Sequence, residues 1–346
     1  MSTSVRAIIS ALLLCVLPAC WQPAEPERAC VVSEYFMTDR DVLLNVDSVA
    51  VWHGAEGQHW LIATAKTGNT LPVYDATTGQ LLKTIGSSGD QPGQLQRPNG
   101  IAVQDNFLFI VERDNKRLQI FNLPDGQSIG ITDERMGLPY GLAVVTVVPG
   151  QRYMIYVTDN AGEHGGKEPK KVHQYDAIYD GQIFNLRLIR SFGDTTGDGA
   201  LWKVESIAAD PYYNRLFVAD EHKERKNVKI YTLDGKFTGK TIGNGLILYE
   251  PEGIALYELN DQEGYVILTD QDRQENTFWI FDRVTLKPIR SFIGNKTRNT
   301  DGIATSNQGF GPFVSGALYA VHDDGNIHAY DWHTLAKSCH LEEKRP

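Results

Sequence analysis

Residues 205–221 have the sequence Glu-Ser-Ile-Ala-Ala-Asp-Pro-Tyr-Tyr-Asn-Arg-Leu-Phe-Val-Ala-Asp-Glu, which predicts one β-hairpin. Ser206–Ala209 is a short strand, Pro211–Arg215 a turn, and Leu216–Ala219 a strand of branched and aromatic residues typical of a buried position. In an antiparallel hairpin the start of one strand lies beside the end of the next. We therefore expect Glu205 and Glu221, which flank the two strands, to project from the same end of the sheet.

The first strand of this hairpin belongs to a phrase that recurs six times along the chain. The copies are Ser48-Val49-Ala50, Gly100-Ile101-Ala102, Gly141-Leu142-Ala143, Ser206-Ile207-Ala208, Gly253-Ile254-Ala255 and Gly302-Ile303-Ala304. A second apolar strand follows each copy, then a third strand that usually ends in an aromatic residue and a turn, and in most units a fourth. The spacing, about forty to sixty-five residues, is that of four-stranded propeller blades. The sequence therefore predicts an all-β protein, a six-bladed β-propeller.

The two ends of the chain are expected to close the ring. Val31–Leu44 has no unit of its own, and we expect it to add a strand to the last blade beside Ile327–Trp332. Cys30 and Cys339 lie near opposite ends of the chain, and a disulfide between them is plausible in an exported protein, with two free thiols as the alternative. Beyond the N-terminal segment, no helical periodicity is longer than a couple of turns.

The N-terminal segment has the features of a signal peptide. Arg6 precedes the apolar run Ala7–Leu17, and Leu17-Pro18-Ala19-Cys20 resembles a bacterial lipoprotein box in which Cys20 is acylated; plain cleavage without lipid stays open. We expect residues 1–19 to be the signal peptide, residues 20–30 a linker and residues 31–346 the propeller. The protein would be exported, either periplasmic and membrane-anchored through lipid on Cys20 or secreted.

Composition limits the classes of partner. The chain of 346 residues carries a net charge of −10, which argues against a nucleic-acid partner. We expect a monomer that binds a small molecule. If that molecule is an anion, local positive charge must come from within the site.

Polar residues stand at equivalent positions of the six units. Those just before the first strands are Asp47, Asn99, Tyr140, Glu205, Glu252 and Asp301. Those just after the second strands are Lys66, Arg113, Asn160, Glu221, Gln271 and Asp323. We call these two sets the first ring and the second ring. By the hairpin argument both rings lie at the same end of the central channel.

The first ring is rich in carboxylates, which repel one another unless protons or cations intervene. Oxygen ligands in this number suit Ca²⁺, and no Cys or paired His accompanies them as zinc would require. Lys66 and Arg113 stand next in the second ring. A cation flanked by Lys and Arg describes a site for phosphate oxygens, because the metal reverses the local sign of charge.

These residues resemble the β-propeller phytases, calcium-dependent phosphatases that act on inositol hexakisphosphate. The resemblance runs from Asp47 to Asp331 and is clearest in Val204-Glu205-Ser206-Ile207, Pro251-Glu252-Gly253-Ile254 and Thr300-Asp301-Gly302. It implies that calcium is bound by Asp47, Tyr140, Glu205, Glu221, Glu252 and Asp301. It implies that phosphate is held by Lys66 and Arg113, with Tyr140 and Asn160 at further substrate-binding positions.

The sequence departs from that family at three positions and also resembles another. Ser48 and Asn295 stand where aspartate is expected, and Asn160 replaces a lysine. The phrase Gly89–Ala102 looks like an NHL-type propeller repeat, a fold that often only binds.

The favoured hypothesis is a calcium-dependent phosphomonoesterase that attacks phosphorus with an activated water. Lys66, Arg113, Glu205 and Glu221 would be its catalytic residues, and the substrate would be a small phosphoester. One alternative is a non-catalytic NHL-like binding protein, and another is a lactonase-like six-bladed hydrolase with a single calcium. Lys66 and Arg113 argue against the lactonase, because a neutral lactone needs no such pair.

Overall fold

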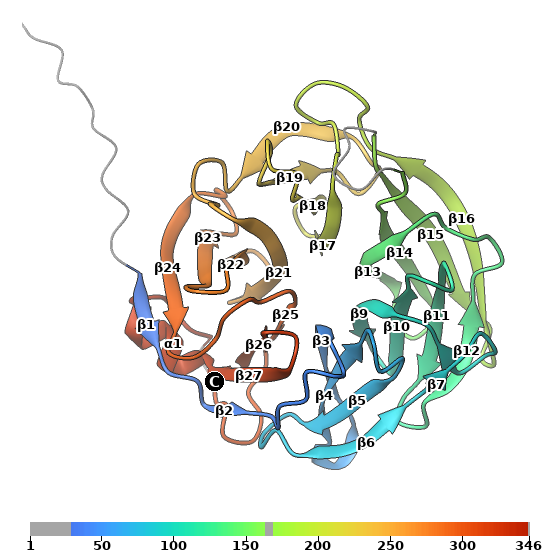
Figure 1. Ribbon diagram of the computed structural model, residues 1–346, viewed down its shortest axis with the longest axis horizontal. Helices are drawn as coiled ribbons and strands as arrows, with labels where there is room; N and C mark the ends of the chain where they lie inside the picture. The colour runs from blue at the N-terminus through green and yellow to red at the C-terminus, as the bar shows by residue number, and fades with distance from the viewer. Residues whose placement is uncertain (1–28, 163–168, 345–346) are drawn as a thin grey trace, which may run out of the picture.

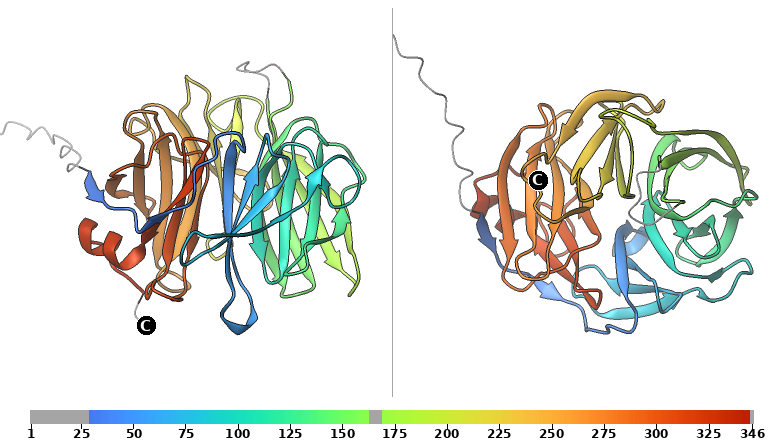
Figure 2. Two further views of the ribbon diagram at one scale, coloured as in Figure 1. Left: turned by 60° about the horizontal axis from the view of Figure 1, so that its bottom comes forward. Right: turned by 45° about the horizontal axis from the view of Figure 1, so that its top comes forward.

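The computed structural model describes residues 29–162 and 169–344, and these form five four-stranded sheets and one five-stranded sheet around a central axis (Figures 1 and 2). The predicted six-bladed β-propeller is therefore confirmed. The expected signal peptide and Cys20 lie outside the described residues. No helix in the described part of the chain is long and apolar enough to cross a membrane.

Five blades take their four strands consecutively from the chain, running from the axis outward. Blade 1 contains β3 (Val46–His53), β4 (His59–Ala65), β5 (Leu71–Asp75) and β6 (Leu81–Ile85). Blade 2 contains β9 (Pro98–Gln104), β10 (Phe107–Glu112), β11 (Arg117–Asn122) and β12 (Gln127–Ile131). Blade 3 contains β13 (Pro139–Val148), β14 (Arg152–Asp159), β15 (Lys171–Tyr179) and β16 (Phe184–Phe192). Blade 4 contains β17 (Val204–Asp210), β18 (Arg215–Asp220), β19 (Asn227–Tyr231) and β20 (Phe237–Ile242). Blade 5 contains β21 (Glu250–Glu258), β22 (Gly264–Gln271), β23 (Thr277–Asp282) and β24 (Pro288–Gly294).

Blade 6 and the connections use the remaining elements. Blade 6 contains β25 (Ile303–Ser306), β26 (Ala317–His322), β27 (Asn326–Asp331) and, from the N-terminal side of the chain, β2 (Phe36–Met37). The others are β1 (Cys30–Val32), the 3₁₀ turn η1 (Ala55–Gly57), the parallel pair β7 (Ser87–Ser88) and β8 (Gln94–Leu95), and α1 (Trp332–Cys339).

The hydrophobic core is divided into six layers, one between each pair of neighbouring blades. Between blades 1 and 2, for example, Ile62 and Val73 share a buried cluster with Leu108 and Phe121. Each sheet is apolar on both faces because it packs against a neighbour on each side, which explains the near-continuous apolar second strands. Burial of these faces holds the blades together, because each Å² of apolar surface removed from water contributes roughly 25 cal/mol to stability.

The inner strand of each of blades 1–5 carries the same irregularity. In blade 4, Val204 pairs with Asp220 and Ile207 with Val218, so Glu205 and Ser206 oppose a single residue. The same two-against-one bulge occurs where the inner strands of blades 1, 2, 3 and 5 pair with their second strands. A bulge bends a strand and re-aims its side chains. In every case the first bulge residue belongs to the first ring.

The second bulge residue is serine in blades 1 and 4 and glycine in blades 2, 3 and 5, where the crowded inner strands leave no room for a Cβ. A Cβ on Gly100 would lie 2.6 Å from the Tyr140 carbonyl oxygen, and one on Gly141 would lie 2.2 Å from that of Glu205. In each case the obstructing carbonyl belongs to the first-ring residue of the next blade. The recurring glycine of the sequence phrase therefore marks contact between blades.

The ring is closed as expected in one respect and differently in two others. β2 pairs with β27, with Phe36 opposite Ala329, so an N-terminal strand does complete the last blade. β1, which the sequence did not predict, adds a fifth strand in parallel to β24 of blade 5. The strand expected at 327–332 ends at Asp331, which caps α1 by accepting the Thr334 N–H, and Trp332 stacks on Tyr257.

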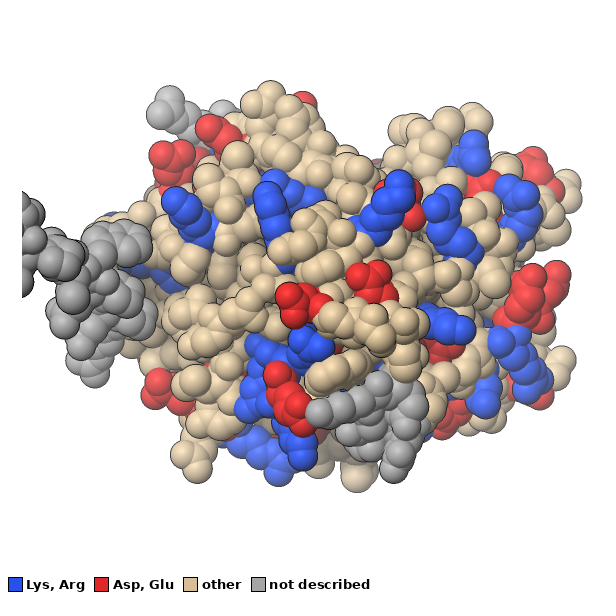
Figure 3. Space-filling view, turned by 90° about the horizontal axis from the view of Figure 1, so that it is seen from above, with Lys and Arg blue, Asp and Glu red and all other residues tan. Residues whose placement is uncertain are grey.

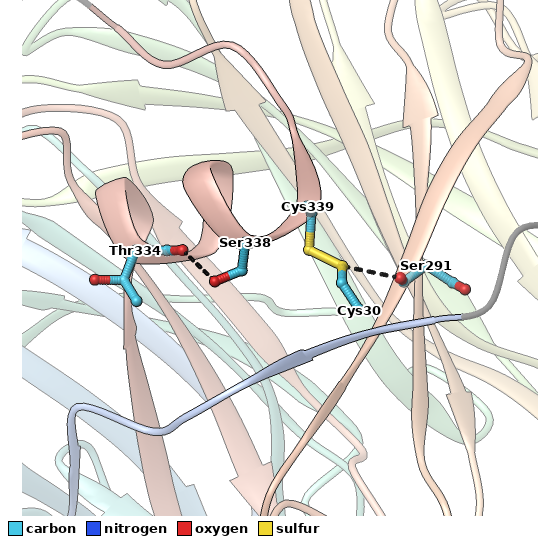
Figure 4. Close-up of a disulfide and its surroundings, with 5 residues drawn as sticks. All are labelled: Cys30, Ser291, Thr334, Ser338 and Cys339. Atoms are coloured by element: carbon cyan, nitrogen blue, oxygen red, sulfur yellow. Dashed lines mark hydrogen bonds between the residues drawn. A yellow bond between two sulfur atoms is a disulfide. The ribbon is translucent and has the colours of Figure 1, made fainter.

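Cys30 and Cys339 form a disulfide with a Cα–Cα distance of 5.6 Å (Figure 4). It joins β1, on the outer edge of blade 5, to the end of α1, which follows blade 6. The bond thus ties the last two blades together at the rim, in addition to the short β2 strand.

We predict that removing this bond lowers stability strongly. It spans 309 residues, and the loop-entropy relation assigns a cross-link of that length about 6 kcal/mol of unfolding free energy. The Cys30→Ser/Cys339→Ser variant should unfold at lower denaturant concentration than the oxidised protein. A reductant should reproduce that shift in the parent and change nothing in the variant; an unchanged midpoint would contradict the prediction.

Candidate functional site

All six residues of the first ring line one small cavity on the axis. Its walls are formed by Asp47, Ser48, Asn99, Tyr140, Gly141, Glu205, Ser206, Glu252 and Asp301. The cavity has a volume of about 20 Å³, room for about one water-sized occupant. A second cavity of about 100 Å³ is lined by the next residues of the repeated phrase, among them Val49, Ile101, Leu142, Ile207, Ile254 and Ile303. The two cavities share Ser48, Gly141 and Ser206 in their walls, so the second cavity adjoins the polar ring along the channel.

Threonines of the second strands hold two of the bulges in place. Thr158 opposes the bulge of blade 3, accepts a hydrogen bond from the Gly141 N–H at 2.9 Å and donates to the Glu205 carbonyl at 2.7 Å. Thr64 likewise accepts from the Ser48 N–H and donates to the Asn99 carbonyl. Each hydroxyl links its own bulge to the first-ring residue of the next blade, so the backbone position of a ring residue is fixed by the blade beside it.

Three carboxylates form the centre of the site. Ligand oxygens of Glu205, Glu221 and Glu252 lie within 4.8 Å of one another. Glu221 comes from the second ring, directly after β18, so the structure brings the two rings together as the hairpin geometry requires. Its Oε1 is buried and has no hydrogen-bond partner in the described structure, and the same is true of Asp301 Oδ2 and Asn99 Oδ1.

Two lysines enter the carboxylate cluster. Lys66 Nζ lies 2.6 Å from Asp47 Oδ1, and Lys203 Nζ lies 2.9 Å from Glu221 Oε2 and 3.3 Å from Glu250 Oε2. Sequence reasoning missed Lys203, because only the residue immediately before each first strand was compared. Its spacing of two from Glu205, which places residues on one face of a strand, was an available indication.

Burial and mutual repulsion shift the acidity of the cluster. Burial first, and then Asp47, raise the pKa of Glu205 to about 7 against the opposing effect of Lys203. Burial and neighbouring carboxylates also raise the pKa values of Glu221, Glu252 and Asp301 well above their ordinary values.

The two lysines respond in the opposite sense. Burial alone would lower the pKa of Lys203, but the carboxylates of Glu221 and Glu205 outweigh it and raise that pKa. Asp47 and Asp301 raise the pKa of Lys66 in the same way. Both ammonium groups are therefore charged at neutral pH. Five carboxylates against two ammonium groups still leave excess negative charge when all are ionised.

Arg113 and Tyr140 stand together at one side of the ring. Arg113 Nε donates to Asp114 at 2.8 Å, and its guanidinium also contacts the Tyr140 hydroxyl. Burial and Glu205 raise the pKa of Tyr140, while Arg113 acts against them. Arg113 is thus placed beside the carboxylate cluster.

The remaining second-ring residues lie in different surroundings. Gln271 donates to Asp301 Oδ1 at 3.0 Å, so it belongs to the site. Asp323 instead forms an ion pair with Arg40 at the partly exposed rim. Asn160 is buried after β14 but does not line the axial cavity. Asn295, an expected ligand position in the resemblance, donates to Ser33 in an exposed loop.

Two aspartates that stand directly before second-ring residues, Asp220 before Glu221 and Asp159 before Asn160, hold loops in place. Asp220 accepts the Trp202 and Lys203 N–H groups and bonds the buried Lys229 ammonium at 2.8 Å. Asp159 likewise accepts hydrogen bonds from the Gly137 and Leu138 N–H groups and bonds the His173 ring. These carboxylates fasten the loops that enter the inner strands, and they are fully partnered. Glu221 Oε1, by contrast, is buried without a hydrogen-bond partner in the described structure, which distinguishes the acids of the site from these structural acids.

No model of a known protein family matches this chain, and no curated protein matches it in sequence. Among solved structures, 726 chains match, which shows how widespread the fold is. One is hydrazine synthase from Kuenenia stuttgartiensis, with a TM-score of 0.51 and 14% identity, covering 83% of this chain and 75% of that one. At this identity the likeness supports the propeller fold alone.

The donor set fits a hard divalent cation. Carboxylate, amide and phenol oxygens surround a cavity of ionic size, several of those oxygens lack partners, and excess negative charge remains. Glu205, Glu221 and Glu252 would be the central ligands, with Asp47, Asp301 and Tyr140 around them.

We predict that the cation-free protein becomes less stable as pH rises from about 5 to about 7. Unfolded Glu205 loses its proton near 4.5, whereas the folded side chain keeps it to about 7. Between those values folding takes up a proton, so the unfolding free energy falls with pH, by roughly 2 kcal/mol for this group. Urea unfolding in a chelating buffer measures the slope.

The Glu205→Gln variant serves as the control, since it removes this group and should make that slope shallower by its share, while Glu221, Glu252 and Asp301 still contribute. Stability that increases with pH over this interval in the parent protein would contradict the assignment.

Proposed function

We propose that the protein is a calcium-dependent phosphomonoesterase of the β-propeller phytase type. The observation that carries the proposal is the convergence of Asp47, Tyr140, Glu205, Glu252 and Asp301 on one cavity, with Lys66 and Arg113 beside it. An acidic centre with adjacent cations is the arrangement expected for a metal that binds an anion. The substrate would be inositol hexakisphosphate or a related phosphoester.

Calcium bound by the carboxylates would supply positive charge that polarises a phosphoryl oxygen. Lys66 and Arg113 would neutralise charge that develops on the equatorial phosphoryl oxygens during in-line attack by water. Glu205 would act as one of the oxygen ligands that hold the cation at the centre of the site. Glu221 would fix the position of the cluster, and no covalent enzyme intermediate is needed.

One observation favours a second candidate, a hydrolase with a single calcium similar to a lactonase. The axial cavity of about 20 Å³ has room for one ion, and Asn99 lines it together with the carboxylates. The two candidates differ in substrate charge. Lys66 and Arg113 favour the phosphoester, because they would have no partner on a neutral lactone.

We predict calcium-dependent release of phosphate from phytate. Activity should vanish in a chelator and return with added Ca²⁺. The Glu205→Gln/Glu252→Gln variant should lose at least about 100-fold in kcat/KM, since it removes two of the carboxylates that would hold the cation. Released phosphate measures the reaction.

Glu56→Gln provides the matched control, because Glu56 is an exposed glutamate in η1 outside the axial ring. Hydrolysis of a lactone without phosphate release would select the second candidate. Calcium binding without turnover of either substrate would indicate a binding propeller, and unchanged phosphatase activity in the double variant would reject the site.

A further inference from the structure

Lys203 lies at the boundary between the buried carboxylates and the solvent. Its ammonium is shared between Glu221, whose side chain is fully buried, and Glu250, whose side chain is 43% exposed. The lysine side chain itself is 16% exposed. The ammonium therefore has one partner inside the site and a second partner at the rim.

The backbone of Lys203 is held fixed while its side chain spans these two partners. The Lys203 N–H donates to Asp220 Oδ1 at 3.1 Å, and the Lys203 carbonyl accepts the Glu221 N–H at 2.8 Å. A long side chain on a fixed backbone can move its charged end without any change in the fold.

A divalent cation and this ammonium would compete for the same oxygen atoms. Glu221 is one of the three clustered carboxylates, and its Oε2 is the atom that Lys203 contacts. An ammonium supplies a single positive charge through hydrogen bonds, whereas a divalent cation binds several carboxylates at once. A cation that binds both oxygens of Glu221 would therefore displace Lys203 from Oε2.

We propose that Lys203 is a displaceable counterion that couples cation binding to anion binding. Without the cation its ammonium neutralises Glu221; with the cation it moves toward Glu250 and the rim, where it contacts an anionic ligand. This inference rests on the calcium site proposed above and adds a third basic residue to the site, beside Lys66 and Arg113, one that contacts the anion only when the cation is bound. Cation and phosphate would then strengthen each other's binding.

The first test compares calcium affinity by isothermal titration calorimetry. Lys203→Gln removes the competitor and should bind Ca²⁺ at least about fivefold more tightly than the parent, while Lys203→Arg keeps the charge and should not. Lys236→Gln is the matched control, because that lysine pairs only with exposed Asp234, away from the ring. Equal affinities in the parent and Lys203→Gln would overturn the inference.

The second test uses the unmodified protein and does not depend on the folding of a variant. Acetylation of lysines by an amine-reactive reagent, read by mass spectrometry, should increase at Lys203 when Ca²⁺ is added and stay constant at Lys236. Unchanged or reduced labelling at Lys203 in calcium-loaded protein would overturn the inference.

The third measurement tests the coupling with inorganic phosphate as the probe. Ca²⁺ should strengthen phosphate binding in the parent at least about fivefold, and by clearly less in Lys203→Gln. Equal enhancement in both proteins would overturn the coupling. If the parent binds no calcium, the proposed function itself fails; if it binds calcium but the Lys203 readouts do not change, only this inference fails.

Discussion

The close approach of the inner strands at the axis is the constraint from which the rest follows. Five of these strands bulge at the same point, and the glycines that follow Asn99, Tyr140, Glu252 and Asp301 have no room for a Cβ because the inner strand of the next blade lies against them. The ring side chains line the axial cavity, whereas the glycines that follow four of them lie against the neighbouring inner strand. A site built this way is held by the whole circle of blades, and any ring residue depends on the one beside it.

Crowding of like charges is the electrostatic result of that geometry. Two carboxylates about 5 Å apart repel by about 3 kcal/mol at an effective dielectric constant of 20. The cluster meets this repulsion in two ways, by retaining protons on Glu205 and its neighbours and by drawing in Lys66 and Lys203. On the side of the propeller in Figure 3, basic and acidic side chains both occur among neutral ones.

The sequence predicted the fold and the ring because both repeat. Gly-Ile-Ala phrases and apolar second strands recur in register, so Asp47 and Asp301 could be matched across a gap of most of the chain. Features that occur once were not accessible in this way. β1 and α1 have no counterpart in other blades, and Trp332 gave no sign of ending a strand and beginning a helix. Repetition also misled: Asp323 occupies a ring position but turns to Arg40, a residue outside the repeats. Lys203 was missed because only the residue directly before each first strand was compared, whereas Lys203 stands two positions before Glu205.

The disulfide has a geometric consequence beyond closing the ring. Cys30 lies on the outermost strand of blade 5, and Cys339 ends the helix beside it, so both bonded segments are at the side wall of the disc (Figures 1 and 4). Neither segment crosses the circular faces. A tether or fusion partner attached next to either cysteine would start at the side wall of the disc and would leave both mouths of the central channel uncovered.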